Sequence, residues 1–494
     1  MSSQSIASRV VATLNANGVS DYLLSPGSRS QALAIAAKQL EDSGKARVTV
    51  RLDERSMAFT GLGISQASNK PVALIVTSGT AVANLFPAVL EAFHSSTPLI
   101  LLTADRPARL RGKGANQTTN QVDIFGFAAK CFDIPIDVTE SDAEGILLQA
   151  LSLIEKEKKP VQINIQFDLP LSSSSPNAND LLANSKVIKS SSRELTELAV
   201  PVDNHTVVIA GAGGERAKEF ARTANLPLLA EPSSGAREGE QVVINYLSQL
   251  EALRDQIRKV VVFGKPTLSR PIQKLISETS VYAEVGRYGK YDPFDNVIAE
   301  AELLKPEGRA DDAWRAKWHS DSLTGPRQEF VQFVWDRSDR LILGASDLIR
   351  VLDSCAKPKK IAVFSNRGLS GIDGTVSTSV GIAMTAGPTT ALIGDLTLLH
   401  DISGLNRTDL PSFDLRIVVG NDHGGKIFSR LEVAKEIDSE SFERLFNTNQ
   451  TVDLHALAAG YGWTYFKCHS LAELEEVWQE SSRGLVLIDY QLGD

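Results

Sequence analysis

The sequence predicts an α/β fold of three domains, each a parallel sheet flanked by helices. At roughly 150 residues per domain, the 494 residues correspond to about three domains. Hydrophobic residues make up 43% and charged residues 22% of the chain, which is typical of a globular protein with substantial cores. Short apolar stretches alternate with helix-like segments, and this alternation is typical of parallel sheets that helices cover on both faces.

The first predicted domain spans residues 1–185. Its runs PVALIV and PLILLT are almost entirely apolar, as strands buried on both faces are. The predicted strands are 22–24, 48–52, 71–76, 98–103 and 161–166, and the predicted helices are 5–17, 55–68 and 80–94. Four serines at 172–175, then Pro176 and a polar run to about Arg193, predict a linker.

The middle domain is predicted over residues 190–340 and the last domain over 341–494. Strands are predicted at 206–210, 259–263 and 281–284, followed by a polar, tryptophan-bearing stretch at 311–320. The last domain begins near Leu341, and its strands are predicted at 361–364, 390–393, 415–419 and 485–489. The stretch GAGGER at 211–216 lacks the third glycine of a dinucleotide-binding fingerprint, so it predicts a tight turn.

Composition excludes several classes of protein. The net charge is −9 and no basic tract stands out, so nucleic-acid binding has no electrostatic support. Cys131, Cys355 and Cys468 form no CxxC pair, which argues against a zinc ribbon or disulfide framework and fits a reducing cytosol. The N-terminal stretch lacks the apolar core of a signal peptide, and no run is long enough to cross a bilayer. We therefore expect a cytoplasmic protein without a membrane span.

The most informative constellation is Gly394-Asp395 followed by the loop at 421–425, NDHGG. Both follow apolar strands, so both should lie at the carboxyl edge of a parallel sheet, where such sheets bind ligands. Two oxygen-bearing side chains and a glycine carbonyl suit Mg²⁺, and the helix expected after Asp395 could hold a diphosphate. On spacing alone, two ordinary loop acids beside a turn are equally plausible.

The GD pair, about 27 residues and an N-[ND] pair resemble the metal–diphosphate motif of thiamin-diphosphate enzymes. Leu396 stands where Gly is common and Asp422 where Asn is usual, and both departures match one branch, the 2-succinyl-5-enolpyruvyl-6-hydroxy-3-cyclohexene-1-carboxylate synthases. The resemblance covers the whole chain, through SPGSRS (25–30), LDERS (52–56), TSGTAVANLFPAV (77–89), LTADRP (102–107), GANQT (114–118), SNRG with SGIDG (365–374), GDLTLLHD (394–401) and GGKIF (424–428).

The resemblance implies thiamin diphosphate and Mg²⁺, or Mn²⁺, as cofactors. Glu54 should share a proton with N1′ of the aminopyrimidine ring, so that the cofactor relays general acid–base catalysis. Ile372 resembles the apolar wedge that bends the cofactor, although core packing is an alternative. The implied cofactor contacts are Glu54, Thr80, Ile372, Gly394, Asp395, Leu396, Asp422, Ile427 and Phe428. The implied metal ligands are Asp395, Asp422 and Gly424, with Asn421 as the alternative to Asp422.

The implied substrates are 2-oxoglutarate and isochorismate, both dicarboxylates that planar guanidinium groups bind well. The implied reaction is decarboxylation of 2-oxoglutarate and 1,4-addition of the succinyl-semialdehyde unit to isochorismate, in menaquinone biosynthesis. The matching substrate positions are Ser28, Arg29, Arg106, Asn116, Gln117, Ser346, Arg350 and Arg367. Arg287 is weaker, because GRYGKYDP replaces the family's G-R-x-D-P. For Arg350, on a predicted helix, a solvated side chain is an alternative.

The resemblance also implies a homodimer or homotetramer in which Glu54 of one subunit and Asp395 of another serve one cofactor. Three alternatives remain open at this point. Another thiamin-diphosphate 2-oxo acid decarboxylase or acetolactate-type synthase would not need so many arginines. A nicotinamide- or flavin-dependent oxidoreductase could use the same sheets. A catalytically inactive binding protein would not need the intact Glu54 and Asp395.

Overall fold

The computed structural model describes residues 2–173, 177–188, 194–481 and 483–493. Contacts divide the chain into two compact units. The first unit comprises Met1–Ser192, Asp373–Gly387 and Asp401–Phe413, and the second comprises Arg193–Ile372, Pro388–His400 and Asp414–Asp494. Every pairing between named strands is parallel, which confirms the predicted fold class of parallel sheets flanked by helices. The bounds of the three predicted domains stay a prediction.

The first unit contains a six-stranded sheet of order β2-β1-β3-β4-β6-β5. Its strands are β1 (Asp21–Leu24), β2 (Arg47–Val50), β3 (Val72–Val76), β4 (Leu99–Asp105), β5 (Lys130–Ile134) and β6 (Val161–Gln166). One core packs α1 (Ser3–Ala16), α2 (Gln31–Asp42) and α6 (Glu140–Glu157) against the sheet. A second core packs α3 (Glu54–Ser68), α4 (Thr80–Ala83) and α5 (Phe86–His94). The short helices of this unit are η1 (Ala108–Leu110), η2 (Gly126–Ala128), α7 (Ala178–Leu182) and η5 (Ile402–Leu405).

Two predictions for this unit need correction. The helix predicted at 80–94 is two helices, because Pro87 lies in the first turn of α5, where its missing N–H costs no helical hydrogen bond. The predicted linker contains α7, which Asn177 caps by accepting a hydrogen bond from the backbone N–H of Asn179. Residues 174–176 and 189–193 of that linker lie outside the described residues.

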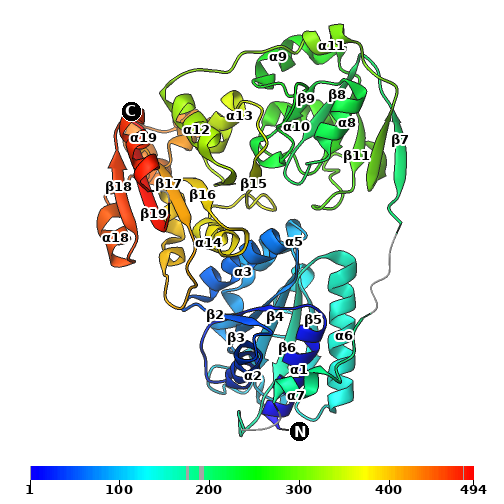
Figure 1. Ribbon diagram of the computed structural model, residues 1–494, viewed down its shortest axis with the longest axis vertical. Coiled ribbons are helices and arrows are strands. Elements are labelled where there is room, and N and C mark those ends of the chain that lie inside the picture. The colour runs from blue at the N-terminus through cyan, green and yellow to red at the C-terminus, as the bar shows by residue number, and fades with distance from the viewer. Residues whose placement is uncertain (1, 174–176, 189–193, 482, 494) are drawn as a thin grey trace. The chain divides into compact units, whose positions relative to one another are not determined.

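Helix α14 (Thr375–Ala386) belongs to the first unit and packs across α3 (Figure 1). Glycines make the close approach possible. A Cβ on Gly63 would lie 2.2 Å from the carbonyl oxygen of Thr378, and one on Gly381 would lie 2.1 Å from that of Thr60. The segment that follows SGIDG therefore supports the helix that begins with Glu54.

The second unit contains a five-stranded sheet of order β12-β11-β10-β8-β9, a two-stranded ladder and a six-stranded sheet of order β15-β14-β16-β17-β19-β18. The five-stranded sheet is made of β8 (Thr206–Ala210), β9 (Leu228–Ala230), β10 (Lys259–Phe263), β11 (Ser280–Glu284) and β12 (Val297–Ala301), and the ladder of β7 (Glu197–Pro201) and β13 (Leu303–Glu307). The six-stranded sheet is made of β14 (Arg340–Leu343), β15 (Ala362–Phe364), β16 (Thr389–Gly394), β17 (Leu415–Asn421), β18 (Thr464–Cys468) and β19 (Leu485–Gln491).

Helices flank these sheets, and the described chain holds none long and apolar enough to span a membrane. They are α8 (Ala217–Ala224), α9 (Tyr246–Leu253), α10 (Arg270–Glu278), α11 (Asp312–Ala316), α12 (Pro326–Arg337), α13 (Asp347–Cys355), α15 (Asp395–His400), α16 (Val433–Glu436), α17 (Ser439–Phe442), α18 (Leu454–Gly460) and α19 (Leu471–Glu480). The shorter turns are η3 (Pro232–Ser234), η4 (Arg254–Gln256), η6 (Lys426–Arg430) and the π-helical η7 (Glu443–Asn447).

Candidate cofactor and substrate sites

A cavity of about 550 Å³ opens in the second unit at the carboxyl ends of β14, β16, β17 and β19. Its size suits a small-molecule ligand. The cavity brings together most of the residues predicted for this half of the site, namely Ser346, Arg350, Ile372, Gly394, Asp395, Leu396, Asp422, Gly424, Ile427 and Phe428. The edge of the sheet at which it lies is the one expected from the strand pattern.

Two carboxyl groups lie close together in this cavity. Asp395 and Asp422 follow neighbouring strands, because Gly394 of β16 pairs with Gly420 of β17. Burial, and then the charge of Asp422, raise the pKa of Asp395 to about 6. The Asp395 Oδ2 atom is buried and has no hydrogen-bond partner among the residues that the structure describes. A divalent cation would satisfy this oxygen and remove the repulsion, so the residues present fit a metal ion.

The geometry favours Asp422 over Asn421 as the second metal ligand. Asn421 Nδ2 donates to Asp489 Oδ1 at 2.9 Å, and Asn421 Oδ1 accepts from the backbone N–H of His423 at 3.0 Å. Asn421 is absent from the cavity lining, whereas Asp422 and Gly424 contribute to it. Only glycine fits at position 424, because a Cβ there would lie 2.5 Å from the carbonyl oxygen of Asn447.

Arg327 is a residue of this cavity that the sequence did not indicate. It lies at the start of α12, and its Nη1 and Nη2 atoms donate to Asp422 Oδ2 at 3.1 and 3.2 Å. Burial raises the pKa of Asp422, and the charge of Arg327 opposes that rise. The sequence placed this segment at the end of the predicted middle domain. The sequence feature that could have indicated a helix start here is Pro326, directly before Arg327.

Glu54 is the first residue of α3 in the first unit. Asp53 caps this helix by accepting from the backbone N–H groups of Arg55 at 2.9 Å and Ser56 at 3.3 Å. Asn84 Nδ2 donates to Glu54 Oε2 at 3.1 Å. Ser403 Oγ donates to Asp53 Oδ2 at 2.7 Å, so the short helix η5 holds the cap. The carboxyl group of Glu54 is thus placed at a fixed helix start.

Arg51 anchors the strand end just before this helix. It is 3% exposed and donates from Nη2 to Ser56 Oγ at 2.7 Å and from Nη1 to the carbonyl oxygen of Asn406 at 3.0 Å. Thr80, a predicted cofactor contact, is exposed at the start of α4.

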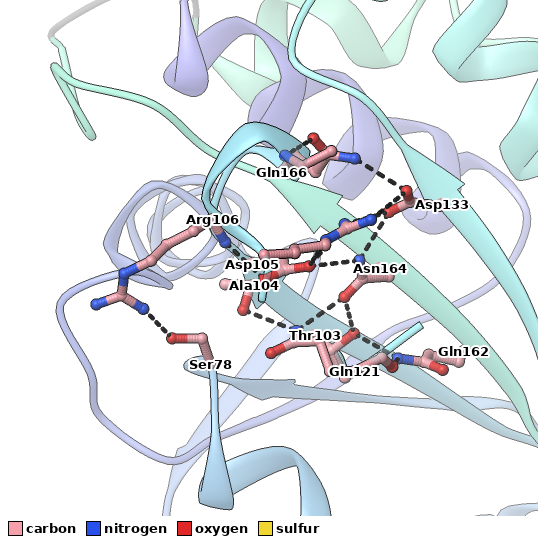
Figure 2. Close-up of polar contacts among 12 residues, drawn as sticks. Ser78, Thr103, Ala104, Asp105, Arg106, Gln121, Asp133, Gln162, Asn164 and Gln166 are labelled. Carbon is pink, nitrogen blue, oxygen red and sulfur yellow. Dashed lines mark hydrogen bonds and ion pairs between the residues drawn. The ribbon is translucent and has the colours of Figure 1, made fainter. Parts of the chain in front are cut away.

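The first unit brings Arg29 close to Arg106. Burial, and then the charge of Arg106, lower the pKa of Arg29, whose Nη1 donates to the carbonyl oxygen of Phe167 at 3.0 Å. Arg106 is 9% exposed and donates from Nη1 to Ser78 Oγ at 2.6 Å (Figure 2). Two neighbouring guanidinium groups attract an anion such as a carboxylate. Gln117 joins them through Ser78, to whose carbonyl oxygen its Nε2 donates at 3.0 Å.

The structure leaves four predicted substrate residues apart from these groups. Ser28 and Asn116 are exposed in loops of the first unit. Arg287 is exposed in the turn after β11, between Gly286 and Gly289, and is absent from the cavity lining. Arg367 is also absent from that lining. It is 2% exposed and donates to Thr267 Oγ1.

Glu231 is a buried neighbour of Arg367 that the sequence did not single out. Burial raises its pKa to about 7, although the charge of Arg367 opposes the rise. Its Oε1 accepts from the backbone N–H of Leu268 at 2.7 Å. The two residues are far apart in sequence, so no local pattern could have linked them.

Comparisons with known proteins identify the class of enzyme to which this fold belongs, the thiamin pyrophosphate enzymes. The family model described as "Thiamine pyrophosphate enzyme, N-terminal TPP binding domain" matches residues 4–124. The chain resembles the solved structure of benzoylformate decarboxylase from Polynucleobacter necessarius with a TM-score of 0.65 and 14% identity, over 99% of this chain and 98% of that one. At this identity the likeness concerns the fold alone.

Full-length relatives narrow the assignment. The chain is 36% identical to the 2-succinyl-5-enolpyruvyl-6-hydroxy-3-cyclohexene-1-carboxylate synthase of Leifsonia xyli subsp. xyli, over 98% of this chain and 95% of that protein. It is 38% identical to the synthase of the same name from Renibacterium salmoninarum, over 98% and 93%. The chain therefore belongs to the 2-succinyl-5-enolpyruvyl-6-hydroxy-3-cyclohexene-1-carboxylate synthase family, which confirms the resemblance found in its motifs.

Proposed function

We propose that this enzyme decarboxylates 2-oxoglutarate and adds the succinyl-semialdehyde unit to isochorismate, with loss of CO₂, in menaquinone biosynthesis. Identity of 36–38% to synthases over nearly the whole chain carries the proposal. The site chemistry supports it, since two dicarboxylate substrates need several cations. Arg29 and Arg106 in the first unit and Arg350 in the cavity of the second are placed to supply them.

The cavity residues are suited to hold thiamin diphosphate and Mg²⁺, with Mn²⁺ as an alternative metal. Asp395, Asp422 and the carbonyl of Gly424 would bind the metal ion. The apolar side chains of Ile372, Leu396, Ile427 and Phe428 would surround the organic part of the cofactor. When bound, thiamin diphosphate supplies the carbon nucleophile and electron sink that decarboxylation requires.

The protein's own contributions are proton sharing, orientation and charge neutralisation. Glu54 would hold a proton at N1′ of the aminopyrimidine ring, and the Asn84 amide keeps its carboxyl group oriented. Arginine contacts to the substrate carboxylates would fix the reacting carbons relative to each other and exclude water. Ser346 lines the same cavity as Arg350 and could accept or donate one further hydrogen bond.

A product assay with 2-oxoglutarate, isochorismate, thiamin diphosphate and Mg²⁺ tests the proposed reaction. We expect CO₂ release and the joined product only when both substrates are present. Release of CO₂ and succinic semialdehyde at the same rate without isochorismate would indicate a 2-oxo acid decarboxylase instead. No turnover of either substrate, in protein shown to bind the cofactor, would refute the proposal.

We further propose a homodimer, or a homotetramer built from dimers, in which Glu54 of one subunit and Asp395 of another serve one cofactor. The family resemblance supports this arrangement. The cytoplasmic location also stays a prediction. Glu54→Gln and Asp395→Asn should each be nearly inactive alone. Refolded together, half of randomly paired dimers are mixed, and roughly a quarter of all sites should be intact. No recovery of activity, despite mixed dimers seen by mass spectrometry, would refute shared sites.

A further inference from the structure

Strand β6 carries a buried row of polar side chains. Gln162, Asn164 and Gln166 alternate along it and therefore point to one face of the sheet, yet they are 0%, 0% and 3% exposed. Buried amides cost free energy unless they are hydrogen-bonded. A buried polar row on a central strand therefore needs a reason, and its partners supply one.

Asn164 is the centre of the resulting network (Figure 2). Its Nδ2 donates to Asp105 Oδ2 at 3.1 Å and to Asp133 Oδ1 at 2.7 Å. Its Oδ1 accepts from Thr103 Oγ1 at 2.9 Å and Gln121 Nε2 at 2.8 Å. The amide thus uses both donors and both acceptor positions, so its orientation is fixed.

Arg111 donates hydrogen bonds to the same two carboxylates, those of Asp105 and Asp133. It donates to Asp105 Oδ2 from Nε at 3.0 Å and from Nη2 at 2.7 Å, and to Asp133 Oδ1 at 3.2 Å. The backbone N–H of Arg106 donates to Asp105 Oδ1 at 2.7 Å. Asp105 is fully buried, so this pairing fixes the turn that carries Arg106.

Gln121 extends the network to two further segments. Its Oε1 accepts from the backbone N–H of Gly79 at 3.2 Å, and its Nε2 donates to the carbonyl oxygen of Ala104 at 3.1 Å. Gly79 follows Ser78, to which the Arg106 guanidinium donates, and Gln117 lies four residues before Gln121. The network therefore ties together the end of β3, the end of β4 and the loop that bears Gln117.

We propose that Asn164, Arg111 and Gln121 are positioning residues that hold Arg106 and Gln117 for a carboxylate of one substrate. None of the three would touch substrate itself; each acts through the Arg106 turn or the 114–121 loop. This inference rests on the proposed function, which places Arg106 and Gln117 at the substrate. It assigns a catalytic purpose to the polar face of β6.

A double-mutant cycle with the full-length enzyme, thiamin diphosphate and Mg²⁺ tests the proposal. Gln121→Leu keeps the side-chain volume but removes three hydrogen bonds. It should raise KM for one substrate by about tenfold, while kcat and the affinity for thiamin diphosphate stay within about threefold. In an Arg106→Ala enzyme the same change should raise KM by clearly less than about tenfold, because one of the two groups that Gln121 positions is gone and only its effect on Gln117 is left.

Two further variants complete the design. Glu144→Gln alters a buried carboxylate of the same unit that accepts from the backbone N–H of Lys186 at 2.9 Å, and KM should not change. Arg111→Lys keeps the charge, but lysine cannot donate to two carboxylates in the forked geometry of arginine. It should therefore raise KM in the way expected of Gln121→Leu, and it replaces that variant in the test if Gln121→Leu does not fold.

The results separate the two proposals. Effects of Gln121→Leu and Arg106→Ala that simply multiply, or a KM unchanged in Gln121→Leu, would overturn the positioning role. Loss of folding in both Gln121→Leu and Arg111→Lys would also overturn it, because the network would then be structural. The proposed function is judged separately, by product formation in the wild-type enzyme.

Discussion

Replacing Asp422 by Ala should abolish tight binding of thiamin diphosphate and Mg²⁺, whereas replacing Asn421 should not. Asp422 lines the same cavity as Asp395, and its charge helps to raise the pKa of Asp395, so a cation bound there would relieve the repulsion between the two carboxyl groups. Asn421 instead uses its amide within the protein, on Asp489 and on the backbone of His423.

Asp422→Ala should therefore lose mainly cofactor affinity, and Asn421→Ala mainly stability. Residues that only orient a metal ligand contribute about 10–100-fold to metal affinity, so loss of Asp422 itself should weaken binding by at least about 100-fold. Burial raises the pKa of Asp422 although Arg327 opposes the rise, so the Asp422 charge does not stabilise the cofactor-free fold and its loss should cost little stability. Asn421→Ala removes two hydrogen bonds of about 1 kcal/mol each, which should lower the free energy of unfolding by about 2 kcal/mol and cofactor affinity by about tenfold or less.

Titration calorimetry with thiamin diphosphate at saturating Mg²⁺ measures the affinity, and thermal unfolding of the cofactor-free proteins measures the stability. Asp395→Asn serves as the control for lost binding, because it removes a charge beside the metal ion and the diphosphate. The reasoning is refuted if Asn421→Ala weakens binding more than Asp422→Ala while its cofactor-free protein melts like the wild type.

Three further predictions concern other parts of the site. Glu54→Gln should bind the cofactor but lose most activity, and unchanged C2 proton exchange of bound thiamin diphosphate by NMR would exclude Glu54 from the mechanism. Arg106→Ala should raise KM by an amount equivalent to about 2–5 kcal/mol without weakening cofactor binding, and equal losses of cofactor and substrate affinity would indicate misfolding instead. The pKa of Glu231 is raised from 4.5 to about 7, so the folded state binds its proton more tightly, and stability should fall as pH rises from about 4.5 to 7. In Glu231→Gln this pH-dependent fall in the free energy of unfolding, on the order of 3 kcal/mol, should be absent. The prediction is contradicted if the free energies of unfolding of the wild type and the variant change equally with pH.

The predicted strands agree with the structure to within a few residues where they are buried on both faces. The predicted strands PVALIV and PLILLT correspond to β3 and β4 of the structure. They were recognisable because a parallel strand that is buried on both faces is apolar along most of its length. The edge strands β5 and β18 were missed, because their sequences KCFDI and TYFKC mix polar and apolar residues. An edge strand is paired on one side only, and its composition approaches that of a loop.

The residues that line the cavity were predictable where they directly follow a strand in the sequence, as at Asp395 and Asp422. Contacts between residues that are distant in the sequence were not predictable. Arg327 reaches Asp422 across 95 residues, and Asn164 reaches Asp105 across 59. Alternating polar residues in VQINIQ were a usable signal for the latter, since a strand buried on both faces would otherwise be apolar.

The two units handle their buried charges in opposite ways. In the first unit, Asp105 is fully buried but paired with Arg111 and Asn164, so the carboxylate is stabilised and the turn is rigid. In the second unit, the Asp395 carboxyl group is buried beside another acid, and its pKa is raised to about 6 as a result. A satisfied network holds Arg106 in place, whereas the Asp395 Oδ2 atom, which has no hydrogen-bond partner among the described residues, leaves a place for a cation. The first arrangement suits preorganisation for an anionic substrate. In the second, a bound cation would relieve the repulsion between Asp395 and Asp422, and this relief would contribute to the proposed affinity for metal and diphosphate.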